Sequence, residues 1–184
     1  MSNLFFQAET SLLLVIDVQE RLWPYVANKE QVRDRCRILM EGAKHLEVPV
    51  IVSEQYPKGL GSSIEEIRQK QAEDTPVCSK TAFGCLGDAG LAQQIGQSRR
   101  PQLVLCGIET HVCVMQTALE AIQEGYQVAV VADAVGSRDE ANRGLGLARA
   151  RAAGATIVSS EMILFEWMRD ARHPAFKAVS ALIR

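Results

Sequence analysis

Short runs of apolar residues recur along the chain, and each is followed by a longer segment with helical spacing. Four of the runs are nearly continuous and rich in Val, Ile and Leu, which is typical of strands that helices cover on both faces. The third run is weaker and is assigned from its position. The predicted strands span residues 12–16, 50–52, 76–78, 103–106, 128–132 and 156–158.

Between these strands, apolar residues return every three or four positions, as they do on one face of a helix. After the fifth strand, Ser137 and Glu140 form a capping-box pair, which predicts a helix that ends near Gly154. The other predicted helices span residues 30–46, 112–124, 162–169 and a short segment after residue 174.

Strands that alternate with helices predict an α/β fold with a parallel sheet. The length of 184 residues fits one domain, residues 1–184. Hydrophobic residues make up 47% of the chain and charged residues 23%, which excludes a disordered protein. The 20 Lys and Arg against 22 Asp and Glu give a net charge of −2, which argues against a nucleic-acid or anionic-membrane partner.

The cysteines indicate a reducing compartment. There are five of them, none in a CxxC pair, and an odd number cannot close into disulfides within one chain. The first residues lack the basic and apolar regions of a signal peptide, and no segment reaches the ~20 apolar residues of a membrane span. We therefore expect a soluble, cytoplasmic protein with free thiols.

In an open parallel sheet, ligands bind outside the carboxyl ends of the strands, so the residues after each apolar run are the candidates for chemistry. These are Asp17, Lys80, the segment 107–114 and Asp133. Each has an ordinary structural explanation when it is taken alone: a carboxylate often caps a turn, and a lysine is usually a surface charge. Cys106 lies inside an apolar run and is expected to act as a small hydrophobe, as is Cys36 on its helical face.

Cys113 differs from the other cysteines because it is predicted in the first turn of a helix, where the helix dipole and unpaired N–H groups favour a thiolate. An acid, an ammonium and a thiol at three strand ends can converge at one edge of the sheet. A carboxylate can take the thiol proton and return it to a leaving group, while an ammonium steadies negative charge. This combination favours a nucleophilic role for Cys113.

These residues resemble the isochorismatase-like cysteine hydrolases, which include nicotinamidases and N-carbamoylsarcosine amidohydrolases. The resemblance rests on the Asp-x-Gln segment at Asp17 and Gln19, the segment from Lys80 to Phe83, and the Gly-x-x-Thr-x-x-Cys-Val segment at 107–114. It covers nearly the whole chain, and the three segments occur in the order that the family has.

The resemblance implies a three-layer α/β/α fold with a six-stranded parallel sheet in the order 3-2-1-4-5-6. It also implies a catalytic triad of Asp17, Lys80 and Cys113. By the same analogy, the peptide bond between Ile108 and Glu109 is cis, and the backbone N–H groups of Glu109 and Cys113 form an oxyanion hole.

Two departures from the family narrow the expected chemistry. Nicotinamidases carry an Asp-x-His metal-binding segment after the second strand, whereas this chain has Ser-Glu-Gln-Tyr-Pro at 53–57 and only three His in total. We therefore expect neither a metal nor another cofactor. Members that hydrolyse isochorismate lack the cysteine, so Cys113 points to cleavage of a C–N bond in a small amide-like substrate, which stays unassigned. Candidate substrate-binding residues are Gln19, Trp23, Tyr56, Phe83 and His111. Packing is an equal alternative for Trp23 and Phe83, and a solvated loop is one for Tyr56. His111 is expected to be a wall residue of the pocket and not a base.

A second hypothesis is a redox-sensitive thiol or interaction protein on a hydrolase fold, without amide turnover. Cys78 and Cys85 near Lys80 support it, since an activated thiol beside others can form a disulfide under oxidation. The complete triad argues for the enzyme instead. Family members usually assemble as dimers or larger rings, so a homo-oligomer is expected.

Overall fold

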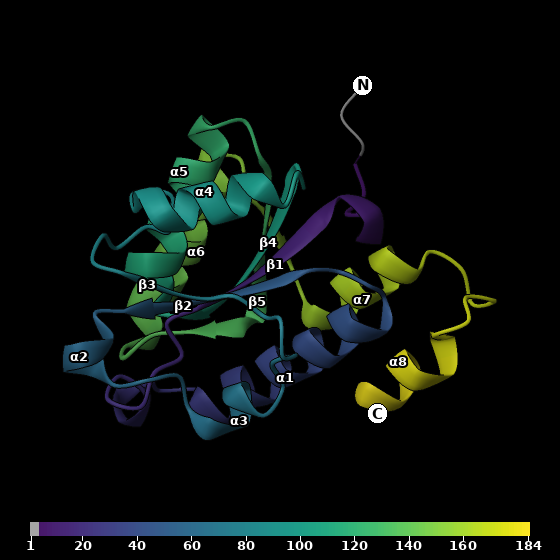
Figure 1. Cartoon of the computed structure of the whole chain (residues 1–184), viewed down its shortest axis with the longest axis horizontal. Coiled ribbons are helices and arrows are strands. Elements are labelled where there is room, and N and C mark those ends of the chain that lie inside the picture. Colours follow the sequence, from purple (N-terminus) through teal and green to yellow (C-terminus); the bar gives the residue numbers. More distant parts are fainter. Residues whose placement is uncertain (1–3) are drawn as a thin grey trace.

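The computed structural model describes residues 4–184, and its centre is a six-stranded parallel sheet in the order β3-β2-β1-β4-β5-β6 (Figure 1). This order confirms the predicted one. The chain runs outward from β1 in one direction, then crosses to β4 and runs outward in the other. The strands are β1 (Ser11–Ile16), β2 (Val50–Gln55), β3 (Val77–Lys80), β4 (Gln102–Ile108), β5 (Gln127–Gly136) and β6 (Thr156–Val158).

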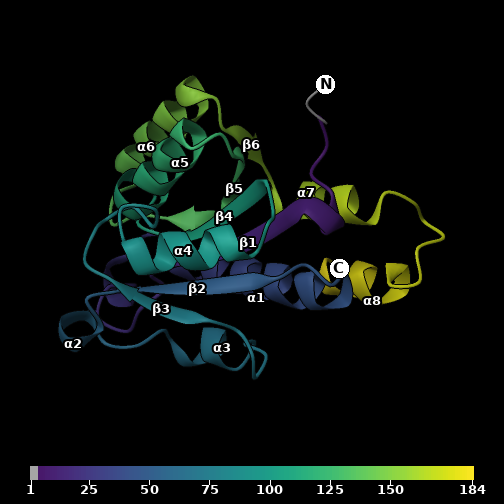
Figure 2. The ribbon, with the colours of Figure 1, turned by 45° about the horizontal axis from the view of Figure 1, so that its top comes forward.

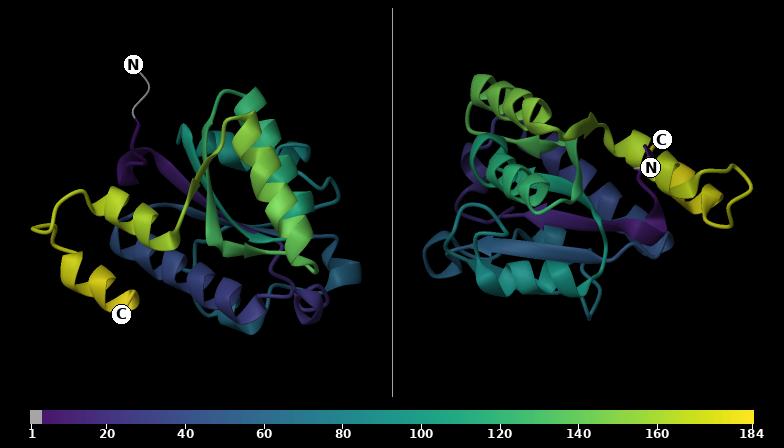
Figure 3. Two further views of the ribbon diagram at one scale, coloured as in Figure 1. Left: turned by 180° about the vertical axis from the view of Figure 1, so that it is seen from behind. Right: turned by 90° about the horizontal axis from the view of Figure 1, so that it is seen from above.

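Helices cover both faces of the sheet, which gives three layers (Figures 2 and 3). One face carries α1, α7 and α8, and the other carries α4, α5 and α6. Two single-turn helices, α2 and α3, lie in the connection between β2 and β3. The helices are α1 (Lys29–His45), α2 (Pro57–Leu60), α3 (Glu65–Arg68), α4 (Ala89–Gln97), α5 (Met115–Gln123), α6 (Glu140–Ala153), α7 (Ser160–Met168) and α8 (Phe176–Leu182).

The central strand β1 explains why the sheet needs both layers. All six of its residues are buried, and alternate side chains enter opposite cores. Leu13 and Val15 pack beneath α1, α7 and α8, whereas Leu12 and Leu14 pack beneath α4, α5 and α6. A continuous apolar run is therefore the pattern of a strand buried on both faces. Within residues 4–184, no helix has the length and apolar character needed to cross a bilayer.

Two sequence-based assignments around β5 are wrong. The strand continues past the predicted residue 132 to Gly136, so Asp133 lies within it. There its carboxylate accepts hydrogen bonds from the backbone N–H and the hydroxyl of Ser160, which fixes the start of α7. The next helix is capped by Asp139, whose carboxylate accepts from the N–H groups of residues 141 and 142, and Ser137 does not cap it. Asp139 is nearer to the start of the helix than Ser137, and its carboxylate takes the capping hydrogen bonds.

Candidate active site

Asp17 follows β1 directly and is completely buried at the carboxyl edge of the sheet. Its φ of 52° places it in the left-handed region, which Asp tolerates better than most residues. Both carboxylate oxygens have close donors. The hydroxyl of Ser53 donates to Oδ1 at 2.7 Å, and Nζ of Lys80 donates to Oδ2 at 2.7 Å. The carboxylate is thus held in one orientation from two neighbouring strands.

Lys80 is the last residue of β3, and its side chain has no exposed surface. Besides Asp17, Nζ donates to Oε1 of Gln55 at 2.7 Å and to the carbonyl of Phe83 at 2.9 Å, with the carbonyl of Ala82 at 3.3 Å. Burial alone would lower the pKa of this ammonium, but the charges of Asp17 and Cys113 raise it above its ordinary value. Every neighbour is an acceptor, so Lys80 is a charged ammonium in the folded protein.

Cys113 lies in a π-helical turn, Thr110–Val114, that joins β4 to α5. Its side chain belongs to the core beneath α4, α5 and α6, and the residue is only 6% exposed. Burial raises the pKa of the thiol well above its usual range, the Asp17 charge raises it further, and Lys80 opposes this shift. The expectation of a thiolate at a helix start is therefore wrong. Desolvation and a buried carboxylate both favour the protonated thiol here.

The backbone before Cys113 is tightly constrained. The Ile108–Glu109 peptide bond is cis. Gly107 has a φ of 113°, and a Cβ at this position would overlap the backbone of Ile16 on the neighbouring strand, so only glycine fits. The carboxylate of Glu109 accepts from the backbone N–H and from Nε of Arg138, at 3.0 and 2.9 Å. These contacts tie the turn that carries Cys113 to the end of β5.

The structure gives Gln19 a scaffolding position. It is fully buried, and its side-chain amide pairs with the backbone of Gln55: Oε1 accepts from N at 2.8 Å, and Nε2 donates to O at 3.0 Å. Nε2 also donates to the carbonyl of Gly61 at 2.7 Å. Both amide protons are therefore engaged by the backbone. This arrangement favours a structural role over substrate contact for Gln19, which the sequence did not indicate.

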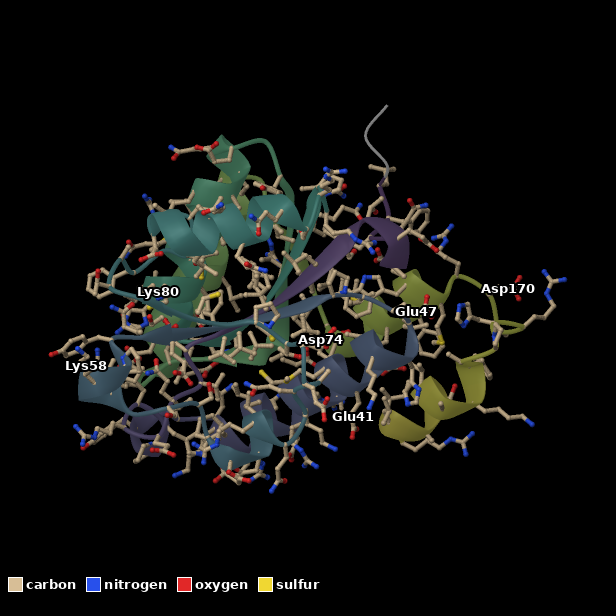
Figure 4. The ribbon with its side chains drawn as sticks, in the orientation of Figure 1. Glu41, Glu47, Lys58, Asp74, Lys80 and Asp170 are labelled. Carbon is tan, nitrogen blue, oxygen red and sulfur yellow. The ribbon has the colours of Figure 1, made fainter. Side chains whose placement is uncertain are left out.

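Of the other predicted pocket residues, Tyr56 borders the site most clearly. It is 55% exposed and, with Lys58, Ser79, Lys80 and Asp88 among others, lines a cavity of about 340 Å³. Figure 4 shows Lys58 and Lys80 at the same end of the molecule.

Phe83 is 54% exposed, although its backbone carbonyl accepts from Lys80. Trp23 is half-buried and packs on the core beneath α1, as the packing alternative predicts. His111 is half-buried too, with Nδ1 3.0 Å from the hydroxyl of Ser137.

The five cysteines are all free thiols. Cys36 and Cys106 are buried in the core beneath α1, which confirms them as small hydrophobes. Cys85 is nearly fully buried, its Sγ lies 3.9 Å from the hydroxyl of Ser53, and burial raises the pKa of its thiol to about 12. Cys78 is half-buried on β3. Sequence reasoning missed Ser53 and Gln55 as parts of the site. Both lie in the segment 53–57, which lacks the Asp-x-His metal-binding residues of nicotinamidases.

Comparison with known proteins places the chain in a family. Residues 11–162 match the isochorismatase domain. The chain belongs to the isochorismatase family. It is 37% identical over 177 residues to the isochorismatase domain-containing protein 2A of Mus musculus, an alignment that covers 96% of this chain and 84% of that protein.

Solved structures of this family share the fold. The MAR1 ribonuclease from Caenorhabditis elegans superposes with a TM-score of 0.92 at 34% identity, covering 97% of this chain and 92% of that one. The YcaC gene product of Escherichia coli is described as an octameric hydrolase of unknown specificity. It superposes with a TM-score of 0.92 at 24% identity, and the match covers 100% of this chain and 91% of that one. This isochorismatase-family chain therefore has a hydrolase fold across its length.

Proposed function

We propose that this isochorismatase-family protein is a cysteine hydrolase that cleaves a C–N bond of a small amide-like substrate. One observation carries the proposal: three functional groups from three strand ends meet in one buried cluster. Lys80 is 2.7 Å from Asp17, and the charges of both residues act on the buried thiol of Cys113. A buried ion pair is costly unless its geometry is excellent, which favours a functional reason for keeping it beside a thiol.

In the proposed reaction, Asp17 takes the proton of Cys113 while the sulfur attacks the substrate carbonyl carbon. The new S–C bond makes a tetrahedral oxyanion, which the backbone N–H groups of Glu109 and Cys113 bind. The C–N bond then breaks, and the leaving amine takes the proton from Asp17. Water attacks the thioester, Asp17 accepts a water proton, and that proton returns to the sulfur as the acid product leaves.

The raised pKa of Cys113 fits this sequence of steps. A thiol that is protonated at rest needs a base in hydrogen-bond contact at the moment of attack, and Asp17 is that base. Lys80 stabilises the negative charge that appears on sulfur, because its own charge is fixed by the surrounding acceptors. The three residues thus divide the roles of nucleophile, base and counter-charge.

A small substrate fits the site better than a polymer. The C. elegans relative is named a ribonuclease. In this chain, however, Asp17, Lys80 and Cys113 are at most 6% exposed, the adjoining cavity holds about 340 Å³, and the net charge is −2. A ribonuclease site has to admit a phosphate backbone, which basic side chains normally attract. We therefore extend the proposal to a small-molecule substrate, without a nucleic-acid or membrane partner and without a cofactor.

The remaining features of the proposal concern the whole molecule. Residues 1–184 form one hydrolase domain that works in the cytoplasm. The octameric state of the E. coli neighbour supports a homo-oligomer for this chain.

A release assay tests the proposed function. Ammonia or amine is measured across a panel of small amides and ureido acids, with a single-stranded RNA as a separate arm. The parent chain is compared with Cys113→Ala and with Cys78→Ala, a matched change of a cysteine that the reaction does not use. We expect turnover of at least one amide that Cys113→Ala loses and Cys78→Ala keeps. Release that persists in Cys113→Ala, or cleavage of RNA alone, contradicts the proposal.

The redox hypothesis needs a different result. Mild oxidation followed by peptide mass mapping would have to give a defined disulfide between Cys113 and Cys78 or Cys85. Cys85 is the better placed of the two, since its Sγ lies 3.9 Å from the hydroxyl of Ser53, which donates to Asp17. Its own thiol is nearly fully buried, with a pKa of about 12, which disfavours the thiolate that forms disulfides.

A further inference from the structure

Lys80 has three ammonium protons, and the fold supplies three close acceptors for them. These are Oδ2 of Asp17 at 2.7 Å, Oε1 of Gln55 at 2.7 Å and the carbonyl of Phe83 at 2.9 Å. The fourth acceptor, the carbonyl of Ala82, is longer at 3.3 Å. An ammonium has no more donors to offer. None of the three protons is therefore left for the sulfur of Cys113.

Gln55 is held so that its oxygen must face Lys80. Its Nε2 donates to the carbonyl of Thr81 at 2.8 Å, and a carbonyl can only accept. The ammonium can only donate, so the amide has one orientation that satisfies both neighbours. Its backbone is fixed as well, because the side chain of Gln19 pairs with both N and O of Gln55. The Asp-x-Gln segment thus supports Gln55 as well as supplying Asp17.

Gln55 also brings no charge to the cluster. Among residues 4–184, Asp17 is the one carboxylate in ion-pair contact with Lys80. The charged and titratable groups that act on the Cys113 thiol are Asp17, Lys80 and Cys85. A neutral acceptor at position 55 keeps the positive charge of Lys80 balanced by a single negative one, which leaves room for a second negative charge on sulfur.

We propose that Gln55 is a positioning residue of the active site: it takes the Lys80 proton that would otherwise reach Cys113, so that Lys80 acts on the thiol through its charge alone. This inference rests on the proposed function, in which Cys113 is the nucleophile. It assigns to Gln55 the control of how readily the thiol ionises, without contact with substrate.

Two substitutions at this position are expected to have opposite effects. Gln55→Glu adds a negative charge beside Lys80, which disfavours the thiolate. Gln55→Met removes the acceptor, and the freed N–H can turn to the sulfur and favour the thiolate. At a pH below the thiol pKa, the rate of alkylation is proportional to the thiolate fraction. A shift of one pKa unit then changes the rate about tenfold.

The experiment measures the rate of alkylation of Cys113 by iodoacetamide at pH 8 in the full chain, with peptide mapping to separate it from the other cysteines. We expect about tenfold slower reaction in Gln55→Glu and faster reaction than the parent in Gln55→Met. The matched control is Glu54→Gln at the preceding residue of β2, whose carboxylate accepts hydrogen bonds from Ser63 and is not among the acceptors of Lys80. Its rate should stay within twofold of the parent.

A purely structural role for Gln55 would loosen the site and change both rates in the same direction, and that outcome overturns the inference. Unchanged rates in both variants overturn it as well, provided that thermal unfolding shows them to be folded. The assay needs no substrate. A failure of amide turnover would therefore count against the proposed function and leave the result on Gln55 standing.

Discussion

Two lysines at opposite ends of the strands differ strongly in burial, although both form an ion pair with a carboxylate. Lys80 lies at the carboxyl ends of the strands, and neither its side chain nor that of Asp17 is exposed. Lys70 pairs with Glu41 near the amino ends, and their side chains are 23% and 33% exposed. Figure 4 shows Glu41, Glu47 and Asp74 well separated from Lys80.

The larger cavity lies at the amino ends of the strands, away from the buried Lys80–Asp17 pair. The amino-end cavity measures about 550 Å³ and is lined by charges of both signs, among them Lys44, Glu47, Lys70, Asp74 and Arg100. The cavity beside Lys80 measures about 340 Å³. Volume alone would select the amino ends of the strands. What distinguishes the carboxyl edge is a charged pair removed from water, with a thiol beside it, because such a pair persists only where its surroundings hold it.

Replacement of the two lysines by Met should separate the edges most strongly. In Lys80→Met, Asp17 is left buried without its counter-charge, so we expect a loss of about 3 to 5 kcal/mol of unfolding free energy. In Lys70→Met, water screens the remaining Glu41, and the expected loss is below about 1 kcal/mol. Urea unfolding of both variants gives the comparison. Similar losses would contradict the distinction drawn between the edges.

The backbone of the carboxyl edge should be equally intolerant. Gly107→Ala forces a Cβ into the backbone of Ile16 at a positive φ, and we expect a loss of about 2 kcal/mol or more. The measurement is again urea unfolding, with the parent as reference. A variant as stable as the parent would mean that β1 and β4 can separate at this point.

The pH dependence of Cys113 sharpens the contrast further. Because burial raises the pKa of its thiol, alkylation at pH 7 should be more than tenfold slower than that of free cysteine and should still rise at pH 9. The thiol loses its proton at a lower pH in the unfolded chain than in the folded one. Its ionisation therefore lowers the free energy of unfolding as the pH rises above about 8.5. A rate that levels off near pH 7 would show a thiolate at rest and contradict this environment.

The smallest effect is expected at the amino edge. Gly96 lies in α4, two residues before Ser98 of the larger cavity, and a Cβ there meets no atom within 4 Å. Gly96→Ala should raise the unfolding free energy by about 0.5 to 1 kcal/mol, because Ala loses less backbone freedom in a helix. Thermal unfolding would detect it. Destabilisation would mean that this surface is more constrained than its open surroundings indicate.

Much of the fold followed from the apolar runs, because buried strands such as 12–16 and 103–106 leave a continuous signal. The extension of β5 to Gly136 did not, since Asp133 interrupts the apolar pattern and its hydrogen bonds to Ser160 are long-range contacts. Ser137 was assigned to a cap because its spacing to Glu140 fits one. A nearer Asp139 takes that role, and spacing alone cannot choose between the two.

In the candidate site, too, some features could be predicted from the sequence and others could not. The positions of Asp17, Lys80 and Cys113 at strand ends could be predicted from order along the chain and from the family resemblance. The state of the thiol could not, because desolvation depends on which helices close over it. Gln55 was visible only as part of the segment 53–57, which follows the second strand where nicotinamidases carry a metal-binding segment. Its contact with Lys80 depends on the pairing of β2 with β3, which places Gln55 opposite Lys80.

The central claim is that Cys113 is the nucleophile, and acylation with an activated ester tests it most directly. The full chain is mixed with p-nitrophenyl acetate, quenched within seconds and analysed by intact mass and peptide mapping. The account predicts one acetyl group on the peptide that contains Cys113, and no such adduct in Cys113→Ala. Acetylation elsewhere at the same rate in both proteins, with Cys113 unmodified, would contradict it.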